Sequence, residues 1–325
     1  MLNFCTLFDS SYLIKGLCMY NSLKKVCLDF HLYIFAFDDL SQKILEESGF
    51  ENITVISLAE FENKELLTAK QNRSKGEYCW TCTPSTIWYC INHFDLSDCT
   101  YIDADVFFYK DPKVLIQELK GNDVLITEHR YTPRYDNTSL AGKYCVQFIT
   151  FRNTTNGLNV LKWWKDVCIN WCFARYEDGK FGDQKYLDDW TTRFRGIHVL
   201  NHLGGGVAPW NMQQYSFRKE DMGIIGTELS SKDEFDLIFF HFHFVHTYNI
   251  RLGYLNYLGI YKIPPSVMKL IYNPYLSLLH DLLSKFEVKN ISIDFLTNKN
   301  RTLPEIIKAI AKFVLKNDSN YTINF

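Results

Sequence analysis

The sequence lacks the features that would place a protein inside a membrane or on a nucleic acid. No uninterrupted apolar stretch reaches the roughly 18 residues that span a bilayer. The first residues, Met1 to Cys5, show no basic segment followed by an apolar stretch and a cleavage site, so we expect no export. The formal net charge is only -2, which gives little attraction to DNA or RNA. We therefore predict a cytoplasmic protein without a nucleic-acid partner, either soluble or peripheral on the inner face of the membrane.

Cysteine, in contrast, is not scarce. The chain has ten cysteines, and in a reducing cytoplasm most should be free thiols that pack as small apolar side chains. Cys79 and Cys82 form a CxxC half-site, and together with Cys168 and Cys172 they could build a four-thiolate zinc site. The second pair has CxxxC spacing, which is not a usual half-site, and both pairs lie in segments with a helical pattern. Free thiols are the favoured interpretation.

The order of apolar segments predicts the fold class. The chain has 325 residues, of which 47% are hydrophobic and 16% aromatic, enough to bury a large core. Apolar runs at residues 3–8, 31–37 and 53–58 alternate with helical patterns, and this βαβαβ order predicts an α/β fold with a parallel, doubly wound sheet covered by helices. Further strands are expected at residues 101–109, 123–127, 144–151, 198–200 and 237–240, and further helices at 59–70, 77–93 and 158–175.

The character of the chain changes after residue 260. Apolar residues recur at helical spacing from Val267 to Leu282, and Thr302-Leu303-Pro304-Glu305 is a capping box before a second amphipathic helix. These helices could pack on the main domain or on a partner subunit, or they could attach the protein to a membrane surface. The solvated lysine face of the second helix favours packing.

Two carboxylates stand inside the most apolar part of the chain. Asp103 and Asp105 interrupt the run from Tyr101 to Tyr109, where a buried ionised carboxylate is costly unless a cation or hydrogen-bond donors meet it. A strand that ends and turns at Asp103 could direct both side chains at one hard ion. Asp9 and Asp38 also follow strands, and the carboxyl ends of parallel strands meet at one crevice. These residues predict a divalent-metal site at that edge of the sheet.

Glycines and histidines mark two further candidate segments. Gly204, Gly205 and Gly206 could let an anion or a sugar approach the backbone closely, or could simply form a tight loop. His241 and His243 share one face of an expected strand, which suggests a metal or phosphate site.

Taken in chain order, these landmarks resemble the nucleotide-sugar glycosyltransferases of the GT-A fold, in particular the family-8 type that includes bacterial lipooligosaccharide galactosyltransferases and glycogenin. The resemblance covers roughly residues 3 to 250. It is carried by Asp9-Ser10-Ser11-Tyr12, by Tyr101-Ile102-Asp103-Ala104-Asp105 as the metal motif, by Phe108-Tyr109-Lys110-Asp111-Pro112, and by Gly182-Asp183-Gln184, Trp210-Asn211 and His241-Phe242. Two segments depart from the family pattern. Cys145-Val146-Gln147-Phe148 replaces an Asn-Ser-Gly segment, and Phe244 and His246 replace a Gly and a Lys, which indicates a divergent bacterial branch.

The resemblance implies a GT-A (Rossmann-like) mixed, mostly parallel sheet over residues 1–260, with a helical extension over residues 261–325. It implies Mn²⁺ or Mg²⁺ bound by Asp103, Asp105 and His241, with His243 as the reserve ligand. It further implies that Asp9, Tyr12 and either Arg73 or Lys75 hold the nucleotide, that Gly204, Gly205, Gly206 and Asn211 line the donor or acceptor pocket, and that Asp183 and Gln184 contact the transferred sugar.

The resemblance implies metal-dependent transfer of a sugar from a nucleotide-diphosphate donor to a glycan or lipid-linked acceptor in surface polysaccharide assembly. A UDP-sugar is the first candidate for the donor. Retention of anomeric configuration follows if the kinship extends to stereochemistry, whereas an inverting enzyme would need a general base, a role open to Asp183.

Two alternatives compete with this interpretation. The motif at Asp103 also resembles the nucleophile motif of haloacid-dehalogenase-type phosphatases, in which the first aspartate attacks phosphate. That family places its motif near the start of the core, whereas three strands precede Asp103 here. Asp188-Asp189 matches the acidic metal pair of that family only weakly. The second alternative is a non-catalytic protein that binds a nucleotide or carbohydrate.

Overall fold

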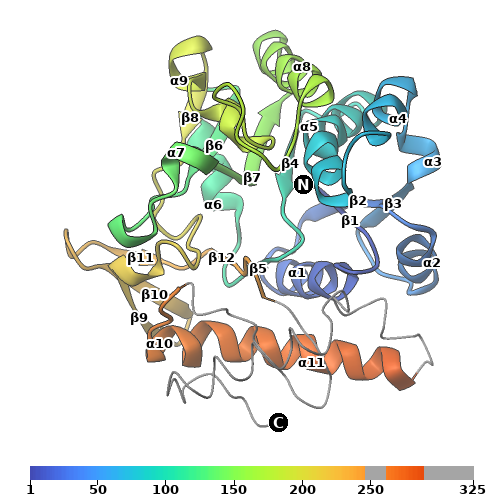
Figure 1. Cartoon of the computed structure of the whole chain (residues 1–325). Helices are drawn as coiled ribbons and strands as arrows, with labels where there is room; N and C mark the ends of the chain where they lie inside the picture. The colour runs from blue at the N-terminus through green and yellow to red at the C-terminus, as the bar shows by residue number, and fades with distance from the viewer. Residues whose placement is uncertain (246–260, 289–325) are drawn as a thin grey trace, which may run out of the picture.

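A computed structural model describes residues 1–245 and 261–288, and a seven-stranded sheet forms its centre (Figure 1). The strand order is β3-β2-β1-β4-β7-β6-β8. These strands are β1 (Leu2–Phe8), β2 (Phe30–Ala36), β3 (Ile53–Ser57), β4 (Asp98–Ile102), β6 (Val124–Glu128), β7 (Tyr144–Arg152) and β8 (Ile197–Val199).

Strand directions confirm the predicted mixed, mostly parallel sheet. Strand β1 runs parallel to β2 and β4, β2 runs parallel to β3, and β6 runs parallel to β8. Strand β7 is antiparallel to both of its neighbours, β4 and β6. Because β1, β2 and β4 are parallel, the residues that follow them, including Asp9, Asp38 and Asp103, lie at the same edge of the sheet.

Helices cover the sheet on two faces, and each face has its own core. Along β1, Phe4 and Phe8 point to one core while Cys5 and Leu7 point to the other, as the period of two in a strand requires. Figure 1 shows α5 and α8 on one side of the sheet and α1 on the other. The helices are α1 (Leu13–Val26), α2 (Asp39–Glu47), α3 (Leu58–Phe61), α4 (Lys64–Lys70), α5 (Lys75–His93), α6 (Lys113–Ile116), α7 (Thr138–Ala141), α8 (Thr155–Asn170) and α9 (Trp190–Arg193).

Local capping explains where several helices begin and end. Asp38 caps α2 by accepting a hydrogen bond from the backbone N–H of Ser41. The helix predicted over residues 59–70 is divided into α3 and α4, because Asn63 takes an extended conformation and caps α4. The helix predicted to reach residue 175 ends at Asn170, since Trp171 leaves the helix in an extended conformation.

The strand predicted over residues 101–109 is broken at Asp103. Strand β4 ends at Ile102, and β5 (Val106–Phe108) leaves the main sheet to pair with β12 (Phe239–His241). A separate three-stranded sheet, which the sequence analysis did not predict, is formed by β9 (Tyr215–Glu220), β10 (Gly223–Glu228) and β11 (Glu234–Asp236). Its strands are short, and charged residues are exposed on β9 and β11.

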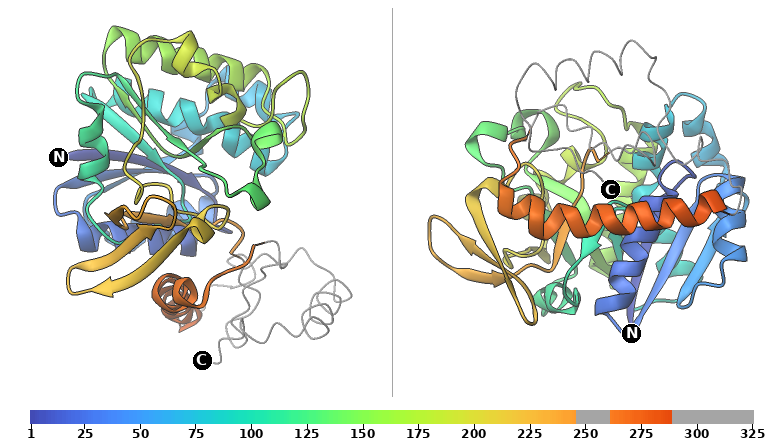
Figure 2. Two further views of the ribbon diagram at one scale, coloured as in Figure 1. Left: turned by 90° about the vertical axis from the view of Figure 1, so that its left-hand side faces the viewer. Right: turned by 90° about the horizontal axis from the view of Figure 1, so that it is seen from below.

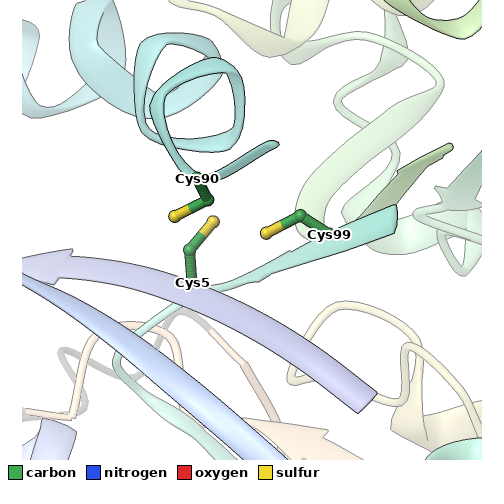
Figure 3. Close-up of side chains that lie close together, drawn as sticks. All are labelled: Cys5, Cys90 and Cys99. Atoms are coloured by element: carbon green, nitrogen blue, oxygen red, sulfur yellow. The ribbon is translucent and has the colours of Figure 1, made fainter. Parts of the chain in front are cut away.

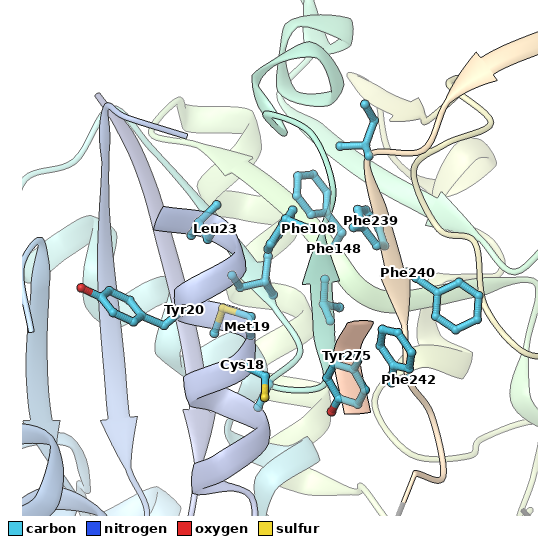
Figure 4. Close-up of a cluster of buried hydrophobic side chains, with 14 of the residues drawn as sticks. Cys18, Met19, Tyr20, Leu23, Phe108, Phe148, Phe239, Phe240, Phe242 and Tyr275 are labelled. Carbon is cyan, nitrogen blue, oxygen red and sulfur yellow. The ribbon is translucent and has the colours of Figure 1, made fainter. Parts of the chain in front are cut away.

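A long C-terminal helix packs against α1 and the β5–β12 pair. It consists of α10 (Pro265–Val267), the π-helical turn η6 (Met268–Tyr272) and α11 (Asn273–Val288). The right-hand view of Figure 2 shows α11 running across the molecule. Tyr275 stacks on Phe242 with ring centroids 3.8 Å apart, and Tyr109 donates a hydrogen bond to the carbonyl of Ile271. Figure 4 shows Tyr275 and Phe242 in one cluster with residues of α1 and β5.

Packing is therefore confirmed for the first C-terminal helix. The capping box at Thr302–Glu305 lies outside the described residues, as does the boundary predicted near residue 260, so both stay predictions. Among the helices in the described part of the chain, none is long and apolar enough to cross a membrane.

Tyr275 offers a test of this packing. Its ring is fully buried, but its hydroxyl finds no hydrogen-bond partner among the described residues. Tyr275→Phe should leave the free energy of unfolding unchanged or raise it, because it removes an unsatisfied polar group at little cost in volume. Tyr275→Ala should lower it by about 3–5 kcal/mol through loss of the stacked ring. Chemical denaturation measures both variants, and a larger loss for Tyr275→Phe than for Tyr275→Ala would contradict the described packing.

Candidate functional site

The two carboxylates lie in a tight turn between β4 and β5. The backbone N–H of Val106 donates to the carbonyl of Asp103 at 3.2 Å, which closes the turn. The N–H of Asp103 donates to the carbonyl of Gln147 at 3.1 Å, which ties the turn to β7. The hypothesis that the strand ends and turns at Asp103 is therefore confirmed.

His241 reaches the same turn from the far end of the chain. Pairing of β12 with β5 places His241 opposite Val106. The backbone N–H of His241 donates to the carbonyl of Val207 at 2.9 Å. Its ring Nε2 lies 3.0 Å from Oδ1 of Asp105 and 3.8 Å from Oδ2 of Asp103. One atom from each of the three side chains lies within 4.8 Å of the others. Two carboxylate oxygens and an imidazole nitrogen suit a divalent ion such as Mn²⁺, so the residues present fit a metal.

Gln147 holds the His241 ring in place. The Nδ1 of His241 lies 2.7 Å from Oε1 of Gln147, and this oxygen can only accept a hydrogen bond. The ring therefore donates from Nδ1, which leaves Nε2 facing the two carboxylates. Trp210 packs edge-on against the ring, with centroids 5.4 Å apart and planes at 87°. A ligating histidine is usually fixed in this way through its second ring nitrogen.

The charges in this group depend on one another. Burial raises the pKa of Asp103, and the negative charge of Asp105 adds to the effect, so the pKa of Asp103 reaches about 6. Burial acts in the same direction on Asp105, but the positive charges of His241 and Lys15 outweigh it and hold the pKa of Asp105 well below its usual range. Burial opposes protonation of His241, yet Asp105 raises the pKa of His241 well above its usual value. The carboxylates thus need positive charge beside them.

Asp183 lies within electrostatic reach of Asp103. It is 6% exposed, and burial together with the charge of Asp103 raises the pKa of Asp183 to about 7. Its carbonyl accepts a hydrogen bond from the indole of Trp164 at 2.9 Å. The next residue, Gln184, instead donates its side-chain amide to the carbonyl of Ala141 at 2.9 Å. The structure thus brings Asp183 to the carboxylates, whereas the amide of Gln184 is bonded to α7.

The loop after β1 approaches the same group. Asp9 accepts hydrogen bonds from the backbone N–H and the hydroxyl of Ser11, at 2.9 and 2.5 Å. Burial and the negative charges of Asp105 and Asp103 raise the pKa of the Tyr12 hydroxyl. Tyr12 therefore lies within electrostatic reach of the two carboxylates, and its role in holding the nucleotide stays a prediction.

Gly204, Gly205 and Gly206 form a tight, buried loop. The carbonyl of Gly204 accepts hydrogen bonds from Ile238 and Phe239, and a Cβ at Gly204 would lie 1.8 Å from the carbonyl oxygen of Asp236. Gly206 has a φ of +93°, and a Cβ there would lie 3.1 Å from Nε2 of Gln147. The loop packs too closely for side chains at these two positions. The tight-loop alternative is thus sufficient to explain the glycines, and a role of Gly204, Gly205 and Gly206 in ligand binding stays a prediction.

Polar side chains fasten this loop. Asn211 is fully buried, donates its amide to the carbonyls of His129 and Gly206, and accepts from the N–H of Ala208. Arg130 donates to the carbonyls of three loop residues, His202, Leu203 and Gly205. Glu118 accepts from the N–H groups of Asn201 and His202 and pairs with His198. The sequence analysis did not assign Arg130 or Glu118 this anchoring role, because their partners are backbone groups that no sequence pattern marks.

Arg73 is not brought to the carboxylates. Its guanidinium lies 3.7 Å from the ring centroid of Phe173 and donates, at 3.4 Å, to the carbonyls of Ile169 and Asn170 at the end of α8. Within the described residues no contact joins it to Asp103 or Asp105. Its predicted contact with a phosphate therefore has no support from this geometry. His243 lies beside Trp210, with centroids 5.5 Å apart, but outside the group of three close ligand atoms.

Three cysteines form a second cluster, away from the crevice. Figure 3 shows the side chains of Cys5, Cys90 and Cys99 close together. They come from β1, α5 and β4, are fully buried in the core, and lie within 4.8 Å of one another. Burial raises the pKa of Cys90 and Cys99 well above the usual value, which favours neutral thiols. All ten cysteines are free and nine are buried, as expected of small apolar side chains. The four-thiolate group considered from the sequence does not appear among the candidate metal-binding groups of the described residues.

Comparison with known proteins places the chain in a family. No protein-family model matches it. The uncharacterized protein YfnD of Bacillus subtilis (strain 168) is 30% identical over 282 residues, which cover 84% of this chain and 87% of YfnD. The chain belongs to the YfnD family. YfnF of the same organism, also uncharacterized, is 30% identical over 247 residues, covering 74% of this chain and 80% of YfnF. The YfnD family members compared here are thus bacterial and uncharacterized, in agreement with the divergent bacterial branch that the sequence indicated.

Solved structures confirm the fold. The crystal structure of the galactosyltransferase LgtC in complex with donor and acceptor sugar analogues superposes with a TM-score of 0.51 at 12% identity, covering 86% of this chain and 96% of LgtC. The YfnD family chain therefore has the GT-A glycosyltransferase fold that the resemblance implied. At this identity the comparison shows the fold alone.

Replacement of Gln147 tests the description of the metal group. Gln147→Met keeps the volume of the side chain but removes the acceptor for Nδ1 of His241, so the affinity for Mn²⁺ should fall about 10–100-fold. Isothermal titration with Mn²⁺ alone measures this, independently of any turnover. Gln42→Met, on the exposed face of α2, is the matched control and should bind like the wild type. Equal affinity of the Gln147→Met variant would contradict the positioning role.

Proposed function

We propose that the protein is a metal-dependent glycosyltransferase that moves a sugar from a nucleotide-diphosphate donor, with UDP-sugars the first candidates, to a glycan or lipid-linked acceptor. The observation that carries the proposal is the convergence of Asp103, Asp105 and His241 at the carboxyl edge of a GT-A sheet. The neighbouring positions of Asp183 and Tyr12 support it, since a donor needs groups for its sugar and its nucleoside beside the metal.

Asp103, Asp105 and His241 would hold Mn²⁺ or Mg²⁺, with Gln147 fixing the imidazole. When bound, the ion would neutralise the diphosphate and act as a Lewis acid that makes it a better leaving group. The buried position of Asp105 and His241, 7% and 5% exposed, would keep water from competing for the ligand atoms.

Asp183 would contact the transferred sugar. With a pKa of about 7 it can accept a hydrogen bond from a sugar hydroxyl when ionised, or take a proton from an acceptor hydroxyl as a general base. The first role suits a retaining reaction, which the family-8 resemblance favours, and the second suits an inverting one. Asp9 and Tyr12, at the start of α1, would hold the base and ribose. Assembly of a surface polysaccharide or lipid-linked glycan is the setting we propose, at the cytoplasmic side of the membrane.

The phosphatase alternative loses support from the geometry. Asp188 accepts a hydrogen bond from the N–H of Lys143 at 2.7 Å and pairs with Lys185 at 2.8 Å, while Asp189 pairs with Arg193. Both acids of the supposed metal pair are thus occupied by neighbouring residues.

A thermal-shift panel of UDP- and GDP-sugars with Mn²⁺ tests the proposal. One sugar nucleotide should stabilise the wild type, and the corresponding nucleoside diphosphate should be released slowly. Asp105→Asn should abolish both effects while leaving the melting temperature without ligand close to that of the wild type. Asp233→Asn, on an exposed turn, is the matched control and should behave as the wild type does.

The other outcomes separate the alternatives. Release of inorganic phosphate from simple phosphoesters would support the phosphatase. Stabilisation without any nucleotide release, with or without added glycan acceptors, would support a binding protein. Undiminished metal-dependent turnover by the Asp105→Asn variant would contradict the site assignment.

A further inference from the structure

Lys15 is a buried lysine at the edge of the candidate site. It is the third residue of α1, directly after the turn that contains Asp9 and Tyr12, and only 8% of its surface is exposed. Its Nζ lies 3.9 Å from the ring centroid of Tyr12. Within the part of the chain that the structure describes, no carboxylate lies close enough to form an ion pair with Lys15. The ammonium group instead makes a cation–π contact with Tyr12.

Physical chemistry disfavours a lysine at this position. Burial of an ammonium group without a paired anion is costly. The amino-terminal end of a helix carries a partial positive charge, which repels cations and attracts anions. Burial accordingly lowers the pKa of Lys15, although Asp105 and Cys18 act on the pKa in the opposite direction. The first turn of α1 contains no acidic residue, and its N-cap Tyr12 makes no side-chain capping bond. Lys15 and the helix end therefore present positive charge together.

This positive charge faces the place where an anion is expected. Lys15 lies over the ring of Tyr12 in the loop after β1, and its positive charge helps to lower the pKa of Asp105, so its ammonium group lies within electrostatic reach of the carboxylate turn. A metal held by Asp103, Asp105 and His241 would bind the same carboxylate, Asp105, whose charge acts on Lys15. Arg73, the cation first considered for phosphate, is instead tied to the end of α8.

We propose that Lys15 binds the diphosphate of the donor, so that the phosphates lie between the metal and the amino-terminal end of α1. This inference rests on the proposed function, since it presupposes a nucleoside diphosphate as ligand. In the complex, the Lys15 ammonium donates charge-assisted hydrogen bonds to phosphate oxygens. The anion supplies the paired charge that the buried lysine otherwise lacks.

A competing role would be purely internal: Lys15 could serve only as a counter-ion that stabilises ionised Asp105. The two roles differ in what they do to metal binding. Removal of a counter-ion leaves the carboxylates more negative, which strengthens binding of Mn²⁺ alone and has no specific effect on phosphate. Removal of a phosphate ligand weakens binding of the diphosphate and leaves the nucleoside unaffected.

The test compares Lys15→Met with the wild type by isothermal titration in the presence of Mn²⁺. The probes are the nucleoside diphosphate, UDP or GDP, that stabilises the wild type, and its nucleoside, uridine or guanosine. We expect the Lys15→Met variant to bind the diphosphate about tenfold to a hundredfold more weakly, and to bind the nucleoside as the wild type does. Lys25→Met, on the exposed end of the same helix, is the matched control and should not change either affinity.

Folding is controlled separately. Methionine has a similar volume and no charge, so the unliganded Lys15→Met variant should melt at the same temperature as the wild type or higher. Lys15→Gln carries the same expectation for the diphosphate and serves if the first variant does not fold.

Equal diphosphate affinity of wild type and both neutral variants, or a gain in Mn²⁺ affinity with unchanged diphosphate affinity, would overturn the role of Lys15 alone. Failure of the wild type itself to bind either nucleoside diphosphate would instead overturn the proposed function, and the role of Lys15 with it.

Discussion

The antiparallel pairing of β5 with β12 is the contact on which the candidate site depends. It carries His241 to a turn whose two carboxylates come from a distant part of the sequence. The N–H of Phe242 donates to the carbonyl of Asp105 at 2.8 Å, so the backbone of β12 is fixed directly to the turn. Because this strand pair lies outside the main sheet, other elements must hold it in place.

Two elements, the glycine loop and the C-terminal helix, contact the strand pair. The glycine loop accepts hydrogen bonds from Ile238 and Phe239 through the carbonyl of Gly204, and it can approach so closely only because it has no side chain there. The C-terminal helix stacks Tyr275 on Phe242. The C-terminal helix is therefore part of the support for the metal group, even though the motifs that resemble glycosyltransferases all lie before residue 250. A substitution that disrupts either the glycine loop or the C-terminal helix should therefore displace His241.

Charge gives the site a second level of organisation. Asp103 and Asp105 cannot both be ionised at low cost in a buried turn, and the raised pKa of Asp103 reflects this. His241 and Lys15 supply positive charge from two different elements, and each is itself costly to bury. A bound divalent ion would add positive charge beside the carboxylates, and a bound diphosphate would add negative charge beside Lys15. The free protein thus holds its charges in an arrangement that a metal-bound nucleotide completes.

The sequence was sufficient to predict the main sheet and the central pair of carboxylates. The apolar runs of β1, β2 and β3 and their alternation with helices are visible in the sequence, and Asp103 and Asp105 stand out because charge is costly in such a run. Other features depend on tertiary contacts that no local pattern reveals. The bond from Gln147 to His241 joins two strands far apart in sequence, and the burial of Lys15 depends on what packs over α1. Strands β9 to β11 were missed because charged residues are frequent in β9 and β11 and because two glycines interrupt β10.

The most direct test of the central claim is an anomalous diffraction measurement at the manganese absorption edge, on crystals grown with Mn²⁺ and the nucleoside diphosphate that stabilises the protein. The account predicts one strong anomalous peak between the carboxylates of Asp103 and Asp105 and the Nε2 of His241, with the phosphates on its open side. A peak bound elsewhere, or full nucleotide occupancy without a peak at these three residues, would contradict it.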